Sequence, residues 1–361
     1  MISIHITFIP DRIPHMSDQP LTAQKGEIEF RKKLVLQQID GVQVLSDEFD
    51  ADSINKILFD RMGTTLKHMM GIKARNIAVS PYVEFGAERC QRSLVMENDV
   101  GASGAAVDIS YDMLKSCSYY RKVFKKEKLP LRICCDINFL PFLSNSIPFM
   151  FCYQTVHHFP DPAMVTREVH RLLSPGGSFF FEEEPYKKVL HFGLYKRKIY
   201  AKETLQLSRF MKAVDFFLAK SVNNETDFGI IENDENPLSI WKKALAVFHH
   251  KDVTLTSIKG ITADLFKPAN RLRYLAAYLC GGGVAGLCRK GGTPVGQEKN
   301  IRDLLICPSC FLEKKEIPLM VGEKRLICGS CGKKYPIVDD ILFLFPYQQF
   351  ETLYPDIFKT V

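Results

Sequence analysis

The stretch from Phe149 to Glu184 decides the fold of this chain, and its sequence is FMFCYQTVHHFPDPAMVTREVHRLLSPGGSFFFEEE. The apolar run at its start and the run at 178–181 each predict a strand that is buried on both faces of a sheet. Between them, Asp161-Pro162 is typical of a helix start, and Pro175-Gly176-Gly177 stops the helix and reverses the chain. A helix between two buried strands forms a crossover unit, which places the two strands parallel. The sequence therefore predicts an α/β fold.

This stretch also resembles the late half of a class I S-adenosylmethionine (SAM) dependent methyltransferase. The resemblance is carried by His157-His158-Phe159 and by the helix end at 171–177, Arg-Leu-Leu-Ser-Pro-Gly-Gly, followed by an apolar strand that closes on acids and a proline. The family usually has Leu and Lys where this chain has Val156 and Ser174. The resemblance extends over about residues 50–185. It implies a Rossmann-like sheet that binds SAM.

Length and composition describe a globular protein with one large or two smaller domains, since the chain has 361 residues, 46% of them hydrophobic and 25% charged. The net charge of +7 is compatible with nucleic acid or an anionic surface and is diagnostic of neither. We find no secretory signal in residues 1–20 and no run near the ~18 apolar residues of a membrane helix. The glycine-rich segment Tyr274–Cys288 is expected to be buried, and peripheral contact with an anionic membrane is the alternative.

The eleven cysteines fall into two sets, four with metal-site spacing and seven others. The seven are an odd number and stand mostly within apolar runs, which favours buried free thiols in a reducing compartment over a disulfide framework. We therefore expect a cytoplasmic protein. The seven are Cys90, Cys117, Cys134, Cys135, Cys152, Cys280 and Cys288.

The segment Pro81–Glu88 is the candidate turn beside the cofactor. A strand that ends in Glu84 and is followed by Gly86 is typical of the ligand crevice of a doubly wound sheet, where glycine lets the backbone approach a ligand. The family usually has two further glycines, where this chain has Glu88 and Cys90. A nicotinamide dinucleotide site needs Gly-x-Gly-x-x-Gly for its pyrophosphate, and Glu88 would repel a diphosphate. SAM has no phosphate and carries a positive sulfonium, so carboxylates are tolerated beside it.

Asp108 ends the second predicted strand, 24 residues after Glu84. A carboxylate about 20 residues after the glycine turn is placed to accept both ribose hydroxyls of a nucleoside. The alternative is a helix cap, a role that Ser110 could serve instead. By resemblance, Asp136-Ile137 after the third strand would contact the adenine. The predicted cofactor-binding residues are Glu84, Gly86, Asp108, Ile109, Asp136, Ile137 and Thr155.

Three residues are candidates for a catalytic role, although the sequence does not identify the catalytic group. His157 and His158 follow the fourth strand, where the family often has a structural His pair, and a general base is the alternative. Glu183 belongs to the acidic run that ends the fifth strand at the same edge of the sheet. The acceptor substrate stays open.

A second strong motif is Cys307-Pro308-Ser309-Cys310 followed by Cys328-Gly329-Ser330-Cys331, with seventeen residues between the two pairs. Each pair directs two thiolates at one ion, so Cys307, Cys310, Cys328 and Cys331 predict a closed, structural zinc site. The flank 331–341 resembles the zinc-ribbon family that includes the small activator subunit of tRNA and protein methyltransferases. Six basic and five acidic residues within 307–346 make a poor nucleic-acid surface. The apolar residues Ile337, Ile341, Leu342, Phe343 and Leu344 predict a face that docks on the catalytic domain or on a partner protein.

We therefore predict four regions: an N-terminal leader or helical extension (1–48), a SAM-binding core (49–186), a helical substrate or cap region (187–300) and a zinc ribbon (301–361). The predicted function is methyl transfer from SAM to an unidentified acceptor, with a small or lipid-like molecule favoured. One alternative is an RNA methyltransferase. Another is a non-catalytic methyltransferase-like protein that acts through its zinc ribbon, which the departures at Glu88 and Cys90 favour.

Overall fold

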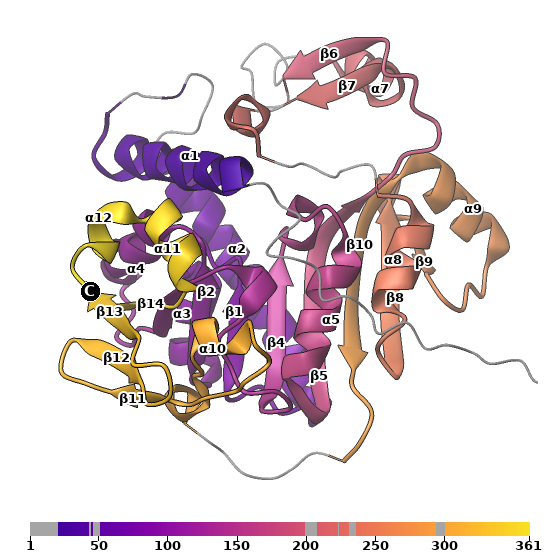
Figure 1. Ribbon diagram of the computed structural model, residues 1–361. Coiled ribbons are helices and arrows are strands. Elements are labelled where there is room, and N and C mark those ends of the chain that lie inside the picture. The colour runs from indigo at the N-terminus through magenta and orange to yellow at the C-terminus, as the bar shows by residue number, and fades with distance from the viewer. Residues whose placement is uncertain are drawn as a thin grey trace, which may run out of the picture.

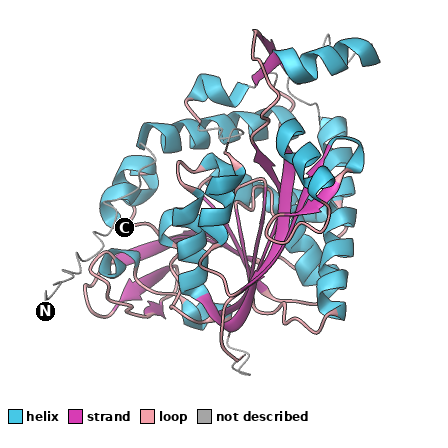
Figure 2. Ribbon diagram, turned by 90° about the vertical axis from the view of Figure 1, so that its right-hand side faces the viewer, coloured by secondary structure: helices cyan, strands magenta, loops and turns pink. Residues whose placement is uncertain are grey.

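The computed structural model describes residues 21–42, 45, 51–198, 208–222, 224–230, 236–293 and 300–361. Residues 1–20 of the predicted leader lie outside this set. A mixed sheet of 12 strands runs through the described chain, and helices cover both of its faces (Figures 1 and 2). The α/β prediction is confirmed.

Five parallel strands form the centre of the sheet in the order β3-β2-β1-β4-β5. Every residue of the first three strands is buried, as expected for strands covered on both faces. Their bounds are β1 (Tyr82–Phe85), β2 (Gly104–Asp108), β3 (Leu131–Cys134), β4 (Ile147–Tyr153) and β5 (Leu173–Tyr186).

Helices begin where the sequence supplies caps. Asp161 Oδ1 accepts a hydrogen bond from the Ala163 amide at 2.9 Å and starts α5 (Pro162–Leu172). The Ser110 hydroxyl caps α4 (Tyr111–Val123), which leaves Asp108 available for another role. Among the described residues, the remaining α-helices of at least five residues are α1 (Leu21–Ile39), α2 (Ala51–Ala74), α3 (Gln91–Val95), α7 (Arg209–Leu218), α8 (Leu238–Leu245), α9 (Arg271–Cys280) and α11 (Tyr347–Leu353).

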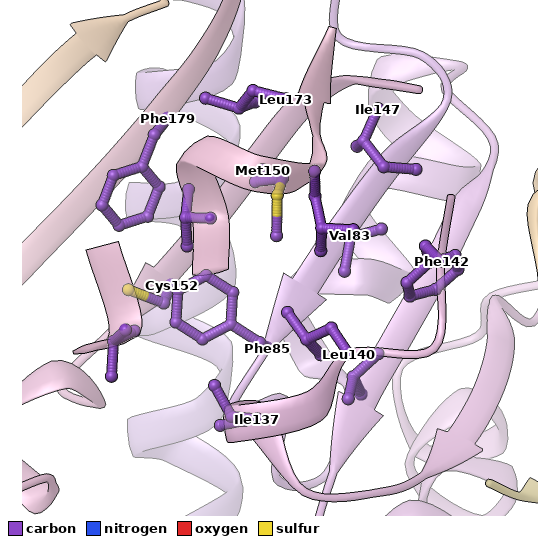
Figure 3. Close-up of a cluster of buried hydrophobic side chains, with 14 of the residues drawn as sticks. Val83, Phe85, Ile137, Leu140, Phe142, Ile147, Met150, Cys152, Leu173 and Phe179 are labelled. Atoms are coloured by element: carbon purple, nitrogen blue, oxygen red, sulfur yellow. The ribbon is translucent and has the colours of Figure 1, made fainter. Parts of the chain in front are cut away.

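The largest apolar cluster lies between the sheet and the α5 side of the molecule, and Figure 3 shows side chains from β1, β4 and β5 meeting there. Phe85, Met150 and Phe179 are all buried in it. All eleven cysteines are free thiols, and of the seven outside the metal motif only Cys280 is partly exposed. This packing fixes the strand ends that carry the site.

The region 187–300 corrects the prediction of a helical cap. Residues 250–289 return to the main sheet, because β10 (Gly282–Arg289) pairs antiparallel with β5 and with β8 (His250–Ser257). Buried and exposed residues alternate along β8, as in a half-buried strand. Gly286 of β10 packs closely against β5, since a Cβ at this position would lie 3.0 Å from the Phe181 ring. The predicted domain boundary at residue 186 therefore falls within a single sheet. Short strands complete the region: β9 (Thr262–Asp264) at the sheet edge, and β6 (Tyr195–Lys198) with β7 (Ala219–Val222) in a separate pair.

The predicted burial of Tyr274–Cys288 holds for only part of this segment. Val284, Leu287 and Cys288 of β10 are buried, whereas on α9 only Ala277 is. Leu275 and Tyr278 are exposed. Within the described residues, no helix is long and apolar enough to cross a membrane.

The C-terminal region joins the opposite edge of the sheet. Its strand β14 (Ile341–Phe343) pairs parallel with β3, and Leu342, Phe343 and Leu344 are buried. The prediction that this apolar face docks on the catalytic domain is confirmed. The other strands of the region are β11 (Leu319–Val321), β12 (Arg325–Cys328) and β13 (Lys334–Val338), and the short helices α10 (Pro308–Phe311) and α12 (Pro355–Phe358) flank them.

Candidate functional site

A cavity of about 380 Å³ lies at the carboxyl ends of the central strands. Gly86 follows β1, Asp108 ends β2, Asp136 follows β3 and Thr155 follows β4, and all four line the cavity. This is the crevice where doubly wound sheets bind ligands, and the volume lies in the range of small-molecule sites. Every predicted cofactor-binding and catalytic residue except Glu84 lines this cavity, including Ile109, Ile137, His157, His158 and Glu183.

Glu84 is the exception, because its side chain does not line the cavity, and its cofactor role stays a prediction. It lies inside β1, one residue before the strand ends, so its side chain points into the protein and is only 1% exposed. Its Oε2 accepts a hydrogen bond from the Ser93 hydroxyl at 2.5 Å. Burial raises the pKa of Glu84 to about 7, despite the opposing effects of Arg92 and Ser93.

The turn after β1 keeps a backbone shape that favours glycine even where glycine is absent. Gly86 has a φ of +65°, and a Cβ there would lie 2.3 Å from the Thr155 hydroxyl oxygen, so this position requires glycine. Glu88 and Cys90 have φ values of +46° and +57°, in the left-handed region. Such conformations cost on the order of 1 kcal/mol each for residues with a Cβ. The two departures from the family motif thus change the side chains and retain the turn.

The carboxylate of Glu88 is neutralised by arginines from other parts of the chain. It lies 3.3 Å from Arg31 Nη1 of α1, 3.8 Å from Arg61 Nη1 of α2 and 3.8 Å from Arg89 Nη1. Burial alone would raise the pKa of Glu88, but the arginines, Arg31 first, lower it to about 2. The added negative charge beside the cavity is therefore compensated.

Asp108 has the geometry expected of a group that holds a ribose. Its Oδ2 accepts a hydrogen bond from the Glu88 amide and its Oδ1 from the Ser110 amide, each at 2.8 Å. Burial raises the pKa of Asp108 to about 6, although these amides oppose the shift. A carboxylate offers about four acceptor sites, so each oxygen of Asp108 keeps acceptor capacity for a hydroxyl group.

Asp136 differs from Asp108 because its acceptor sites are filled. Oδ2 accepts hydrogen bonds from Gln24 Nε2 of α1 at 2.8 Å and from Gln349 Nε2 of α11 at 2.6 Å. Oδ1 accepts from the amide and the side chain of Asn138, both at 2.9 Å. In this conformation, contact between the Asp136 carboxylate and an adenine amino group requires one of these donors to leave.

The loop after β4 is organised by Glu184. This carboxylate is fully buried and accepts hydrogen bonds from the amides of Thr155, Val156 and His157 at 2.7–3.1 Å. It also lies 2.9 Å from His157 Nδ1. Burial alone would raise the pKa of Glu184, but His157 and these amides lower it. Glu183, which lines the cavity, has a φ of +61° that turns it away from this network.

Sequence reasoning missed the outer wall of the cavity, which α1 supplies. Gln24, Phe30 and Arg31 line the cavity from this helix, and Glu225 lines it from the 3-10 helix Asn224–Phe228. Arg31 Nη2 lies 3.5 Å from Glu225 Oε1, which ties the two segments together. The only signal in the sequence was the mixture of charged and aliphatic residues over 26–48, which predicts no particular contact.

The four cysteines of the metal motif converge as their spacing predicts. Their sulfur atoms all lie within 4.8 Å of one another, with 3.7 Å between Cys307 and Cys331 and 3.6 Å between Cys310 and Cys328. Four thiolates at about 2.3 Å from one Zn²⁺ would be separated by roughly 3.8 Å. The donor set therefore fits a tetrahedral zinc ion without a position for water.

Comparison with known proteins points to one family. Residues 83–181 match the sequence model of the methyltransferase domain. An uncharacterized chloroplastic methyltransferase of Arabidopsis thaliana is 33% identical over 91 residues, which are 24% of this chain and 25% of that protein. The chain thus matches about a quarter of the length of this curated relative.

Solved structures with a similar fold are more distant. Phosphoethanolamine N-methyltransferase 2 of Haemonchus contortus, in complex with SAM, is 13% identical with a TM-score of 0.38, over 72% of this chain and 60% of that one. The [4+2]-cyclase SpnF is 12% identical with a TM-score of 0.40, over 75% of this chain and 98% of that one. Matches at this level assign no function.

Proposed function

We propose, on the premise that residues 83–181 form a class I SAM-dependent methyltransferase domain, that this protein transfers the methyl group of SAM to an acceptor molecule. One observation carries the proposal: Gly86 and Asp108 meet at one cavity, at the strand ends, within the matched segment. SAM, when bound, supplies an electrophilic methyl group on a positively charged sulfur. The residues of the chain supply binding, orientation and the exclusion of water.

The inner residues of the cavity fit the nucleoside part of SAM. Asp108 retains acceptor capacity on both carboxylate oxygens, which suits the two ribose hydroxyls. Gly86 lets the backbone come close to a ligand, and Ile109 and Ile137 offer apolar surface for an adenine ring. A carboxylate at Glu88 does not repel a cationic ligand, and arginines balance its charge.

We propose His157 as the group that accepts a proton from the acceptor. His157 Nδ1 lies 2.9 Å from the Glu184 carboxylate, which fixes the orientation of the ring. Among the candidates, His157 combines a position on the cavity with a buried carboxylate that orients it. His157→Gln should lower the turnover rate and leave SAM affinity within about twofold, because the group acts on the acceptor.

A small or lipid-like acceptor is the class that we favour. Tyr153 and Phe159 also line the cavity and offer ring surface to an apolar molecule. The zinc ribbon, with its near balance of charges, offers little attraction to the phosphates of RNA. We also propose that the ribbon holds one structural zinc ion.

A second candidate is a methyltransferase-like protein that does not bind SAM. The filled acceptor sites of Asp136 favour it, together with the side chains of Glu88 and Cys90 in the glycine turn. Such a protein would act through a partner. Direct binding separates the two candidates.

The test is calorimetric titration of the folded, zinc-loaded protein with SAM and with S-adenosylhomocysteine. Micromolar binding to either, lost in Asp108→Ala and kept in Asp112→Ala, supports the proposal. Asp112 is a suitable control because it stands four residues further along, at the start of α4, and does not line the cavity. The absence of binding to both ligands would reject methyl transfer and favour the second candidate.

A further inference from the structure

The chain that follows β5 exposes large apolar side chains that ordinarily would be buried. Leu194 is 70% exposed, Phe210 on α7 is 75% exposed and Leu272 on α9 is 78% exposed. Leu190, Phe192 and Leu275 are exposed as well. Single exposed apolar residues are normal, whereas a group of them indicates a contact surface. We call these six residues the apolar face.

Hydrogen bonds connect the elements that carry the apolar face. The Leu190 amide donates to the Leu279 carbonyl at the end of α9, at 2.8 Å. The Phe192 and Leu194 amides donate to carbonyls at the end of α7, those of Phe217 and Leu218, at 2.8 and 2.7 Å. The segment 190–194 therefore bridges the two helices. Figure 1 shows α7 and α9 toward the end of the molecule to which β4 points.

The spacing along the helices places apolar side chains in outward stripes. Leu272 and Leu275 are three residues apart on α9, and the exposed Phe210 and Phe217 are seven apart on α7. Residues three or seven apart lie on one side of a helix. On α9 this side points away from the core, because Ala277 is the buried residue of the helix.

The same segments are strongly basic. Residues 187–198, 209–220 and 267–280 contain eleven lysines and arginines and a single acidic residue, Asp215. They have a formal charge of +10, whereas the whole chain has +7. Asp215 is paired with Arg197 at 2.9 Å. Within the described chain, Arg271 and Arg273 are exposed and make no ion pair.

We propose that the apolar face docks on an anionic lipid membrane. Leu272 and Phe210 insert at the boundary between headgroups and acyl chains, and Arg271 and Arg273 contact anionic headgroups. Interfacial membrane helices present apolar side chains beside basic ones, without acidic residues among them. A membrane fits better than RNA, because the face is made largely of leucines, which do not stack on bases as aromatic rings do. The proposal does not depend on methyl transfer.

The test is co-sedimentation of the full chain with phosphatidylcholine vesicles, with and without phosphatidylserine. We expect binding only to the vesicles that contain phosphatidylserine, with a steep decrease at high salt. The double variants Phe210→Ser/Leu272→Ser and Arg271→Glu/Arg273→Glu should each bind roughly tenfold more weakly. The matched control is Met320→Ser/Val321→Ser, because these β11 residues are 56% and 70% exposed on the ribbon.

Several outcomes would overturn the proposal. These are no binding of the wild type to either vesicle, equal binding by all variants, and binding that the ribbon variant loses. Displacement of the wild type from vesicles by a homopolymer RNA, with the apolar variant unaffected, would indicate a nucleic-acid surface instead. SAM titration of the same variants separates the two proposals, since SAM affinity should not change when the apolar face does.

Discussion

The inner and outer walls of the cavity come from different parts of the chain. Gly86 and Asp108 of the inner wall stand at strand ends, inside the segment that matches the methyltransferase family. The outer wall is α1, whose Arg31 reaches Glu88 across 57 positions and whose Gln24 contacts Gln349 across 325. The order of the strands in the sheet brings the residues of the inner wall together, whereas the outer wall forms only when distant segments of the chain pack against the sheet. Segments outside the methyltransferase match therefore complete the cavity and balance the charge of Glu88.

We expect the largest effect from removing the zinc site of the C-terminal region, because Gln349 of this region contacts Gln24 of the outer wall. Cys328→Ser deletes one of four thiolates, and structural zinc sites contribute roughly 10 kcal/mol to the folding of their modules. We expect about one zinc ion per chain in the wild type, its loss in the variant, and a decrease of more than about 3 kcal/mol in unfolding free energy. Elemental analysis and thermal unfolding measure the two effects.

The partly exposed Cys280, outside the ribbon, provides the control for that substitution. Cys280→Ser should keep both the zinc content and the stability. A Cys328→Ser protein that is metal-free, folded and as stable as the wild type would show that zinc is not structural here.

Next in size is the loss of the inner carboxylate in Asp108→Ala. Two hydroxyl hydrogen bonds to a charged acceptor contribute about 1.5 kcal/mol each, so SAM affinity should fall about a hundredfold. Calorimetric titration measures the change, with circular dichroism to establish that the fold is intact. An unchanged affinity would refute the ribose assignment and leave the inner wall without a function in binding.

A smaller effect should follow from loosening the outer wall at Arg31. Arg31→Met removes the closest cation from Glu88, whose Arg61 and Arg89 contacts remain, so we expect a loss of about 2 kcal/mol in unfolding free energy. Denaturant unfolding is the measurement. Adding Glu88→Gln to Arg31→Met should restore part of the stability, because it removes the partly unpaired charge.

Arg75→Met is the matched control, since Arg75 pairs with Asp252 at 3.2 Å on the exposed surface. It should change the unfolding free energy by less than about 0.5 kcal/mol. Equal effects at Arg31 and Arg75 would mean that the buried contacts of α1 add nothing to the cavity.

The smallest effect should be a pH dependence that differs between the carboxylates of Asp108 and Glu88. Burial raises the pKa of Asp108 to about 6, so the protonated form dominates below that pH and SAM affinity should fall roughly tenfold per pH unit. Asp108→Asn should remove this dependence. The pKa of Glu88 is shifted the other way, to about 2, so its stabilising contribution to folding is full above the ordinary glutamate pKa and is lost only as the pH falls toward 2. A flat affinity between pH 5 and pH 7 would contradict the assignment for Asp108.

The sequence predicted correctly which residues line the cavity where their position follows from the end of a single strand. Asp108 and Thr155 follow recognisable apolar runs, so both could be assigned to the cavity edge. Glu84 also belongs to such a run, but its side chain is buried within β1 and does not line the cavity. The strand β10 was hidden in a region predicted as helical, because its glycines weaken the pattern.

The sequence by itself determined the α/β class, the cysteine ligand set and the carboxylate at the end of β2, because each depends on spacing within a short segment. Only the tertiary structure decided that α1 closes the cavity, that four arginines surround the turn and that Gln349 reaches Asp136. These contacts join residues up to 325 positions apart. Their geometry results from the packing of whole elements, and no local pattern of residues encodes such packing.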